Sequence, residues 1–256
     1  GAFGHLHCVD LDSGAVVWKR QLAEDFATKP PTWGYCAPPA LVDDLLIVNP
    51  GAKDASVAAL DPSTGKTIWQ TPGNPAAYAA FTTIDGVSPR QVAGFDAISV
   101  GGWEVANGRR LWTLTAEQTG DFNVPSAVAI GRRLLLASEN NGARIHAWDD
   151  MGQPSPSPLG SNQDMTPDTC TPVCLGGRIF AAGLGALVCL DAGDRLQTIW
   201  RQEEDAFDSH SSIIAGNDRV LVLTSYGDLI LLDARADRFQ PVSRFKLSPP
   251  TATWSH

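Results

Sequence analysis

Residues 59–69 of this chain read ALDPSTGKTIW, and this stretch decides the fold. An acid follows two apolar residues, a glycine comes four positions after the acid, and a tryptophan comes four positions after the glycine. The same spacing occurs in VDLDSGAVVW at 9–18 and in WEVANGRRLW at 103–112. A motif that returns at a regular interval predicts a repeat architecture, in which each copy is one supersecondary unit.

The residues of the motif have a structural interpretation. We expect the acid to end the third strand of a unit and to fix the following turn by accepting backbone hydrogen bonds. The glycine allows the positive φ of that turn, and the tryptophan packs onto the next unit. The residues interpreted in this way are Asp10, Gly14, Trp18, Asp61, Gly65, Trp69, Glu104, Gly108, Trp112, Asp191, Trp200 and Asp233.

The interval between the motif acids measures the size of the unit. Successive acids from Asp10 to Asp233 are 42 to 51 residues apart, with most intervals near 43. This is the length of a four-stranded propeller blade. Short runs rich in Val, Leu and Ile precede each acid, and no long segment has a helical period. The sequence therefore predicts an all-β propeller of four-stranded antiparallel blades with almost no helix.

The strand count predicts five full blades and a partial blade at each end. We expect one propeller domain over 1–256, incomplete at both ends, as part of a ring of seven or eight blades. A ring of six blades closed by the two termini is the alternative. The predicted blades are 1–22 (partial), 23–73, 74–118, 119–162, 163–205, 206–248 and 249–256 (partial).

The composition argues against several classes of function. The hydrophobic fraction of 43% is enough for a sizeable core, and the charged fraction of 18% is too low for disorder. The net charge is −9 and the 19 basic residues are scattered, so we expect no nucleic-acid partner. No apolar run approaches the roughly 20 residues of a membrane span. We interpret the five cysteines as small buried thiols, with a redox or ligand role as the alternative.

The motif resembles the repeat of the pyrroloquinoline-quinone (PQQ) propeller family, A-L-D-x-x-T-G-x-x-x-W, which residues 59–69 match in full. That family includes quinoprotein alcohol dehydrogenases, outer-membrane assembly lipoproteins of the BamB type and other bacterial propellers. The resemblance implies a periplasmic or secreted protein of a bacterial envelope. The dehydrogenases carry two adjacent cysteines over the quinone, and this sequence has no Cys-Cys pair. We therefore expect no cofactor, with PQQ and Ca²⁺ as the alternative.

Candidate ligand-binding residues come from the start of the first strand of each blade, which faces the central channel of a propeller. Aligning these starts predicts a ring of polar and aromatic side chains at one channel mouth: Tyr35, Tyr78, Asn123, Asp168, His210 and Trp254. Trp33, Asp121 and Asp208 lie in the preceding loops. Such a ring suits a polar organic ligand or a peptide. The alternative is that these residues only complete strand ends and line a water-filled channel.

The functional prediction is a monomeric, non-catalytic binding or scaffold propeller. Its partner is a protein, a peptide or a small polar ligand held at the channel mouth. No standard catalytic motif occurs in the sequence. The alternative is a PQQ-dependent alcohol dehydrogenase with the quinone held at the same mouth.

Overall fold

The computed structural model describes residues 1–208 and 210–247. Within these residues, helical structure is limited to the short helix α1 (Leu22–Asp25) and the 3-10 turn η1 (Asp205–Phe207). All strand pairs are antiparallel, and strands consecutive in the chain are neighbours in each sheet. The prediction of an all-β chain with four-stranded antiparallel blades is confirmed. In the described part of the chain, no helix has the length and apolar character needed to span a membrane.

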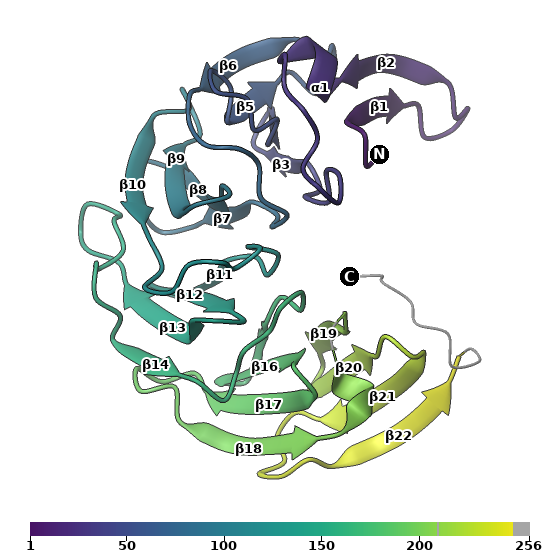
Figure 1. The fold of residues 1–256 in the computed structure, drawn as a ribbon, viewed down its shortest axis with the longest axis vertical. Coiled ribbons are helices and arrows are strands. Elements are labelled where there is room, and N and C mark those ends of the chain that lie inside the picture. The colour runs from purple at the N-terminus through teal and green to yellow at the C-terminus, as the bar shows by residue number, and fades with distance from the viewer. Residues whose placement is uncertain (209, 248–256) are drawn as a thin grey trace. The chain divides into compact units, whose positions relative to one another are not determined.

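Two compact units divide the chain. Unit 1 comprises Gly1–Thr115 and Asp150–Gln153, and unit 2 comprises Ala116–Asp149 and the described part of 154–256. Each unit is built from successive sheets, which Figure 1 shows as hairpins following one another along the chain.

Unit 1 contains one two-stranded and two four-stranded sheets. The first sheet pairs β1 (His5–Val9) with β2 (Val16–Gln21). The second contains β3 (Ala40–Val42), β4 (Leu45–Val48), β5 (Val57–Leu60) and β6 (Thr67–Thr71). The third contains β7 (Thr82–Ile84), β8 (Gln91–Phe95), β9 (Val100–Glu104) and β10 (Arg110–Leu114).

Unit 2 contains three four-stranded sheets. The first contains β11 (Val128–Ile130), β12 (Arg133–Ser138), β13 (Gly142–Ala147) and β14 (Gly160–Asn162). The second contains β15 (Val173–Leu175), β16 (Arg178–Gly183), β17 (Ala186–Asp191) and β18 (Thr198–Glu203). The third contains β19 (Ser212–Gly216), β20 (Arg219–Leu223), β21 (Asp228–Asp233) and β22 (Pro241–Lys246).

The two middle strands of the sheets form the core. Every residue of β5 and of β8 is buried. β5 carries only apolar side chains, and in β8 the exception is the buried Gln91. In unit 1 one core cluster joins Ile47 of β4 to Val92 of β8, and in unit 2 another joins Leu187 of β17 to Ile230 of β21. Neighbouring sheets within each unit therefore pack face to face.

A β-bulge accompanies the sequence motif. In the sheet β3–β6, the pairing register between the third and fourth strands shifts at Ala59/Leu60. The register between the third and fourth strands also shifts in the sheets whose third strand ends at Glu104, Asp191 or Asp233. No shift occurs between β13 and β14, whose repeat has lost the glycine and tryptophan. The motif therefore includes a bend of the last strand, since a bulge locally increases strand twist.

The sheets fall within the predicted blade intervals. The two-stranded sheet lies in 1–22, and each four-stranded sheet lies in one of the five full intervals. The partial blade predicted at 249–256 lies outside the described residues. The single propeller domain and the blade number of the ring stay predictions.

Candidate functional site

The carboxylates of Asp10 and Asp61 accept hydrogen bonds within the turns that follow them. Asp10 Oδ1 accepts a hydrogen bond from the backbone N of Ser13 at 2.8 Å, and Asp61 Oδ1 accepts one from Ser63 N at 2.7 Å. The hydroxyl of the same serine donates to each carboxylate, and these bonds lower the pKa of Asp10 and of Asp61. Glu104 departs from the pattern, since its carboxylate forms an ion pair with Arg109.

The motif tryptophans bond the next sheet. Each indole N–H donates to a backbone carbonyl in the turn that follows the next acid: Trp18 to Pro62 at 2.8 Å, Trp69 to Val105 at 2.9 Å and Trp200 to Ala236 at 3.1 Å. The bond satisfies the polar end of a ring whose body is packed between two sheets. This hydrogen bond is a specific contact between neighbouring blades. From the sequence we predicted only that the tryptophan packs onto the next unit.

Trp112 is connected to the next repeat indirectly, through the side chain of Gln91. Its indole donates to the side-chain oxygen of Gln91, and the Gln91 amide donates to the carbonyl of Gly152 at 2.7 Å. Gln91 is fully buried on β8, and Gly152 lies in the turn of the fourth repeat. The buried Gln91 amide thus takes the place of a direct hydrogen bond from the tryptophan to the turn of the fourth repeat, a turn that differs from the motif.

The motif glycines have a second role that sequence reasoning missed. Gly65 and Gly108 have φ of 70° and 74°, as the turn prediction required. In addition, a Cβ on Gly108 would lie 2.3 Å from Cε3 of Trp69, and one on Gly65 would lie 2.7 Å from Cε3 of Trp18. The indole of one blade therefore lies directly against the glycine of the next.

The predicted ligand-binding residues lie in the segments that precede the first strand of each sheet, which we call the lead-in loops. In unit 1 the lead-in loops before β3 and β7 bring aromatic rings together: Trp33 and Tyr78 have ring centroids 5.6 Å apart. Tyr35 donates its hydroxyl to the carbonyl of Pro50 at 3.0 Å, and burial raises its pKa. Trp33 is 55% exposed, so this cluster presents an aromatic surface to solvent.

In unit 2 the lead-in loops are joined by threonine hydroxyls. Thr169 Oγ1 accepts from the backbone N of His210 at 3.0 Å, and Thr171 Oγ1 accepts from Ser126 N at 3.0 Å. Asn123 and His210 both have positive φ, at 55° and 64°. A side chain other than glycine seldom adopts this conformation, which is found at turns and binding sites.

Three carboxylates lie near these loops. Burial raises the pKa of Glu139, and the negative charges of Asp121 and Asp168 raise it further. Asp121 is held by the side chains of Asn140 and Asn141 at 2.9 Å and 2.7 Å. Although burial opposes ionisation, the hydrogen bonds leave the pKa of Asp121 lowered. Among the described residues, no group of three or more acidic, histidine or cysteine side chains has a geometry that would hold a metal ion.

The predicted ring is corrected in one respect. Tyr35, Tyr78, Asn123, Asp168 and His210 precede the first strands and do not begin them. Tyr35 and Tyr78 belong to unit 1, whereas the other three belong to unit 2, and Trp254 lies outside the described residues. The grouping of all six around one channel mouth stays a prediction.

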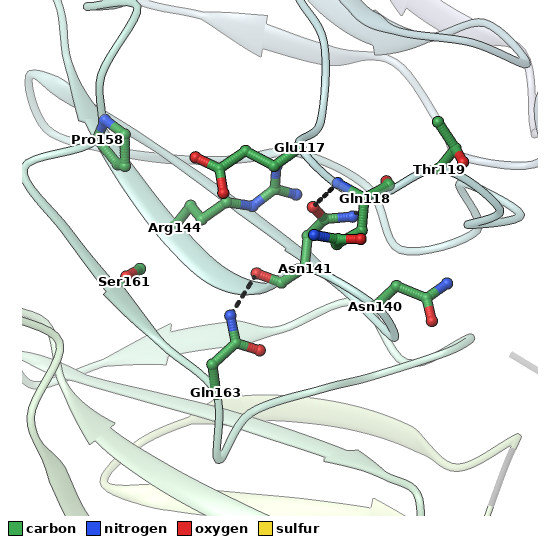
Figure 2. A pocket seen from close by; sticks show the side chains of 9 residues that line it. All are labelled: Glu117, Gln118, Thr119, Asn140, Asn141, Arg144, Pro158, Ser161 and Gln163. Atoms are coloured by element: carbon green, nitrogen blue, oxygen red, sulfur yellow. Dashed lines mark hydrogen bonds between the residues drawn. The ribbon is translucent and has the colours of Figure 1, made fainter.

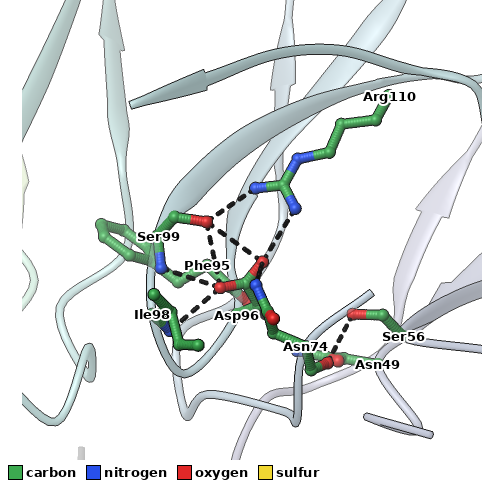
Figure 3. Close-up of polar contacts among 8 residues, drawn as sticks. All are labelled: Asn49, Ser56, Asn74, Phe95, Asp96, Ile98, Ser99 and Arg110. Atoms are coloured by element: carbon green, nitrogen blue, oxygen red, sulfur yellow. Dashed lines mark hydrogen bonds and ion pairs between the residues drawn. The ribbon is translucent and has the colours of Figure 1, made fainter. Parts of the chain in front are cut away.

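A buried ion pair in unit 1 has no counterpart in the sequence prediction. Asp96 is fully buried, and its carboxylate accepts from Arg110 Nη1 at 2.9 Å, from Ser99 N at 2.8 Å and from Asn74 Nδ2 at 3.2 Å (Figure 3). The Arg110 guanidinium lies 4.7 Å from the ring centroid of Trp103. Asp96 and Ser99 form the turn between β8 and β9, and the spacing D-x-x-S was the available signal for that turn. We interpret the cluster as structural.

The cysteine prediction is wrong for one residue. Cys170 and Cys189 are buried, and burial raises the pKa of each thiol to about 12. Cys8 and Cys174 are half-buried, but Cys36 is exposed in the loop before β3. Cys36 lies in an irregular loop with four prolines, outside the buried strands.

Comparison with known proteins identifies the repeat. The family described as outer membrane protein assembly factor BamB matches residues 1–169. No curated protein matches the sequence significantly. The crystal structure of BamB from Moraxella catarrhalis is similar to this chain with a TM-score of 0.67 at 15% sequence identity, covering 96% of this chain and 71% of that one. The computationally designed protein Ika8 is similar with a TM-score of 0.66 at 11% identity, covering 93% and 68%. The chain therefore belongs to the family of the outer membrane protein assembly factor BamB, and its sheets are blades of a PQQ-repeat β-propeller fold.

Proposed function

We propose that this chain is a non-catalytic binding propeller that holds a protein or peptide partner on its lead-in loops. Family membership supports a binding or scaffold propeller, and protein partners, in general. The observation that carries the finer proposal is the exposed indole of Trp33, which packs on Tyr78 in the lead-in loops of unit 1.

Exposed aromatic side chains recur in these loops. Trp33 is 55% exposed, and Phe122 in the lead-in loop before β11 is 50% exposed. Large aromatic side chains supply much of the binding energy at protein interfaces, because they bury a large area and lose little conformational entropy. Loops carried by rigid sheets are a common place for such contacts. The lead-in loops therefore suit a partner that covers Trp33 or Phe122.

The partner class follows from the family. BamB is described as an outer membrane protein assembly factor. This likeness supports the proposal that the chain is a periplasmic or secreted bacterial protein that binds a component of outer-membrane protein assembly. We further propose that it is a monomer. No nucleic-acid partner is part of the proposal, because the chain carries a net charge of −9.

The proposed function involves no quinone cofactor. The adjacent cysteines of the dehydrogenases have no counterpart in this sequence. The carboxylate oxygens of Asp121 already accept hydrogen bonds from Asn140 and Asn141, which reduces their availability as Ca²⁺ ligands. Titration of the purified protein with PQQ and Ca²⁺ tests this proposal. A spectral shift of the quinone, or dye-linked oxidation of an alcohol, would support the dehydrogenase alternative instead.

Site-specific photocrosslinking tests the proposed partner surface. A photoreactive phenylalanine at position 33, or separately at position 122, should crosslink to an envelope protein in cells of the source bacterium. Position 68 provides a matched control, because Ile68 is 52% exposed on the outer strand β6, away from the lead-in loops. Equal crosslinking from position 68, or none from 33 and 122, would contradict the proposal.

A further inference from the structure

Unit 2 contains a polar pocket of about 520 Å³. It lies beside β13 and β14 and the loop that precedes β11, and all its lining residues belong to unit 2 (Figure 2). The volume is in the range of small-molecule sites, but the lining is polar where most such sites are apolar. Four amide side chains contribute to it: Gln118, Asn140, Asn141 and Gln163. Such a lining suits a small, highly polar ligand.

The framework of the pocket is held in place by hydrogen bonds. Asn141 accepts from the backbone N of Gln118 at 2.8 Å and donates to its carbonyl at 2.9 Å. Gln163 donates to the carbonyl of Asn141 at 3.2 Å. Figure 2 shows these contacts bringing the loop, the β12–β13 turn and the segment after β14 together around the pocket. A pocket ordered in this way loses little further entropy when a ligand binds.

Arg144 supplies a positive charge that the protein leaves largely unpaired. It lies on β13 opposite Ser161 of β14. Within the described residues its guanidinium makes one side-chain hydrogen bond, a long one of 3.3 Å from Nη2 to Ser138 Oγ. Its Nε is buried without a partner there. Burial lowers the pKa of Arg144, while Asp121 and Glu117 act in the opposite direction. A guanidinium stays charged and has five N–H donors, so its Nη groups suit a carboxylate.

Glu117 supplies a negative charge in the same pocket. Across the described part of the chain, neither Glu117 nor Arg144 forms an ion pair within 4.0 Å, with each other or with another side chain. Figure 2 shows the Glu117 carboxylate and the Arg144 guanidinium on the same side of the pocket. A simple anion would be attracted by Arg144 but repelled by Glu117 and by nearby Asp121. A ligand with both charges complements both side chains.

We propose that this pocket binds a free α-amino acid, with the ligand carboxylate on the Nη groups of Arg144 and the ligand ammonium on Glu117. The side-chain amide of Gln118 and the side-chain oxygen of Gln163, whose N–H donates to Asn141, are the groups offered to polar atoms of the ligand side chain. The proposal concerns a small-molecule ligand and does not require the protein-binding function, although the loop that carries Glu117 also carries Phe122.

Calorimetry with each of the twenty standard amino acids, tested singly at concentrations up to about 10 mM, measures this binding. At least one amino acid should bind. Its N-acetyl derivative, which lacks the ammonium, and its α-amide, which lacks the carboxylate, should each bind at least about tenfold more weakly. The proposal is overturned if no amino acid binds, or if either derivative binds as tightly as the parent.

Two variants locate the binding in the pocket. Arg144→Gln should weaken binding of the amino acid at least about tenfold, since a bidentate charged contact is lost. Glu117→Gln should weaken binding of the amino acid and leave the affinity for the N-acetyl derivative unchanged. Arg235→Gln is the matched control, because Arg235 is an exposed arginine elsewhere in unit 2, with 70% of its side chain accessible. If the Arg144→Gln variant unfolds, the test depends on Glu117→Gln, because Glu117 is exposed. Unchanged binding of the amino acid to that variant overturns the proposal.

Discussion

The indole N–H of Trp69 donates a hydrogen bond of 2.9 Å to the backbone carbonyl of Val105, in the next blade. Val105 follows directly after the acid of the third repeat, so the residue that ends one repeat is bonded to the turn of the next. Trp69 is 9% exposed and belongs to the core cluster that joins the two sheets. The repeat therefore stabilises the contact between blades as well as the turn within each blade.

Trp69→Phe should destabilise unit 1. The variant keeps an aromatic ring but leaves the buried Val105 carbonyl without its donor, which costs about 1–3 kcal/mol. Trp18→Phe removes the equivalent bond to Pro62 at a less buried site, so we expect a smaller loss. Urea unfolding of both variants measures the difference. Equal stabilities of Trp69→Phe and wild type would show that the bond adds nothing to packing.

Gly108→Ala should be more destabilising than Gly14→Ala. Both glycines have positive φ, at 74° and 70°, so both variants share a backbone cost of about 1–2 kcal/mol. Only at position 108 does the new Cβ meet a neighbour, at 2.3 Å from the Trp69 ring, whereas nothing lies within 4 Å at position 14. Overpacking adds about 1–3 kcal/mol. Thermal unfolding of the Gly108→Ala and Gly14→Ala variants measures the cost of overpacking as the difference in their stability. Equal losses of stability would argue against a clash with the Trp69 ring.

The sequence predicted the parts of the fold that depend on residues close together in the chain. The acid, the glycine and the tryptophan of 59–69 lie within one hairpin, so their spacing alone indicates the strand order, the turn and the period. The position of the lead-in loops followed from the same period, although Tyr35 and the other candidates lie before the strands and not at their starts.

Contacts between residues far apart in the chain could not be predicted in this way. Gln91 bonds Gly152, 61 positions later, and neither residue belongs to a recognisable motif. Arg144 lies in the strand sequence GARIHA, where it resembles any polar interruption of an apolar run. Its role in a pocket depends on the packing of a preceding loop against β13, which follows from tertiary structure and not from local propensity.

Asp96→Asn should destabilise unit 1 strongly. The substitution keeps the size of the side chain but removes the charge that faces Arg110 at 2.9 Å, where only 1% of the Asp96 side chain is exposed. Breaking a buried pair by neutralising one partner costs about 3–5 kcal/mol, because the other charge stays buried. Asp237→Asn breaks the Arg178 ion pair at an 86% exposed carboxylate and should cost about 1 kcal/mol or less. Denaturant unfolding of the two variants compares their losses of stability. Similar losses would mean that the stabilising contribution of Asp96 does not depend on its charge.

Glu139→Gln should stabilise the protein at neutral pH. Burial raises the pKa of Glu139, and the charges of Asp121 and Asp168 raise it further. Because the pKa in the folded state is above the unfolded value of about 4.3, the stability contributed by protonated Glu139 is present at low pH and is lost as the pH rises through the folded pKa. At pH 7 the wild type therefore keeps an unfavourable charge that glutamine lacks.

The gain from Glu139→Gln should be larger at pH 7 than near pH 4, because the raised pKa makes protonation of the wild-type carboxylate easier as the pH falls. Urea unfolding at both pH values measures it. Glu24→Gln provides the control, since Glu24 is an exposed carboxylate on α1. A Glu139→Gln variant that is less stable than wild type at pH 7 would mean that the hydrogen bond from the Phe122 backbone, which favours the ionised carboxylate, outweighs the effects that raise the pKa. In that case the repulsion from Asp121 and Asp168 would be the smaller effect.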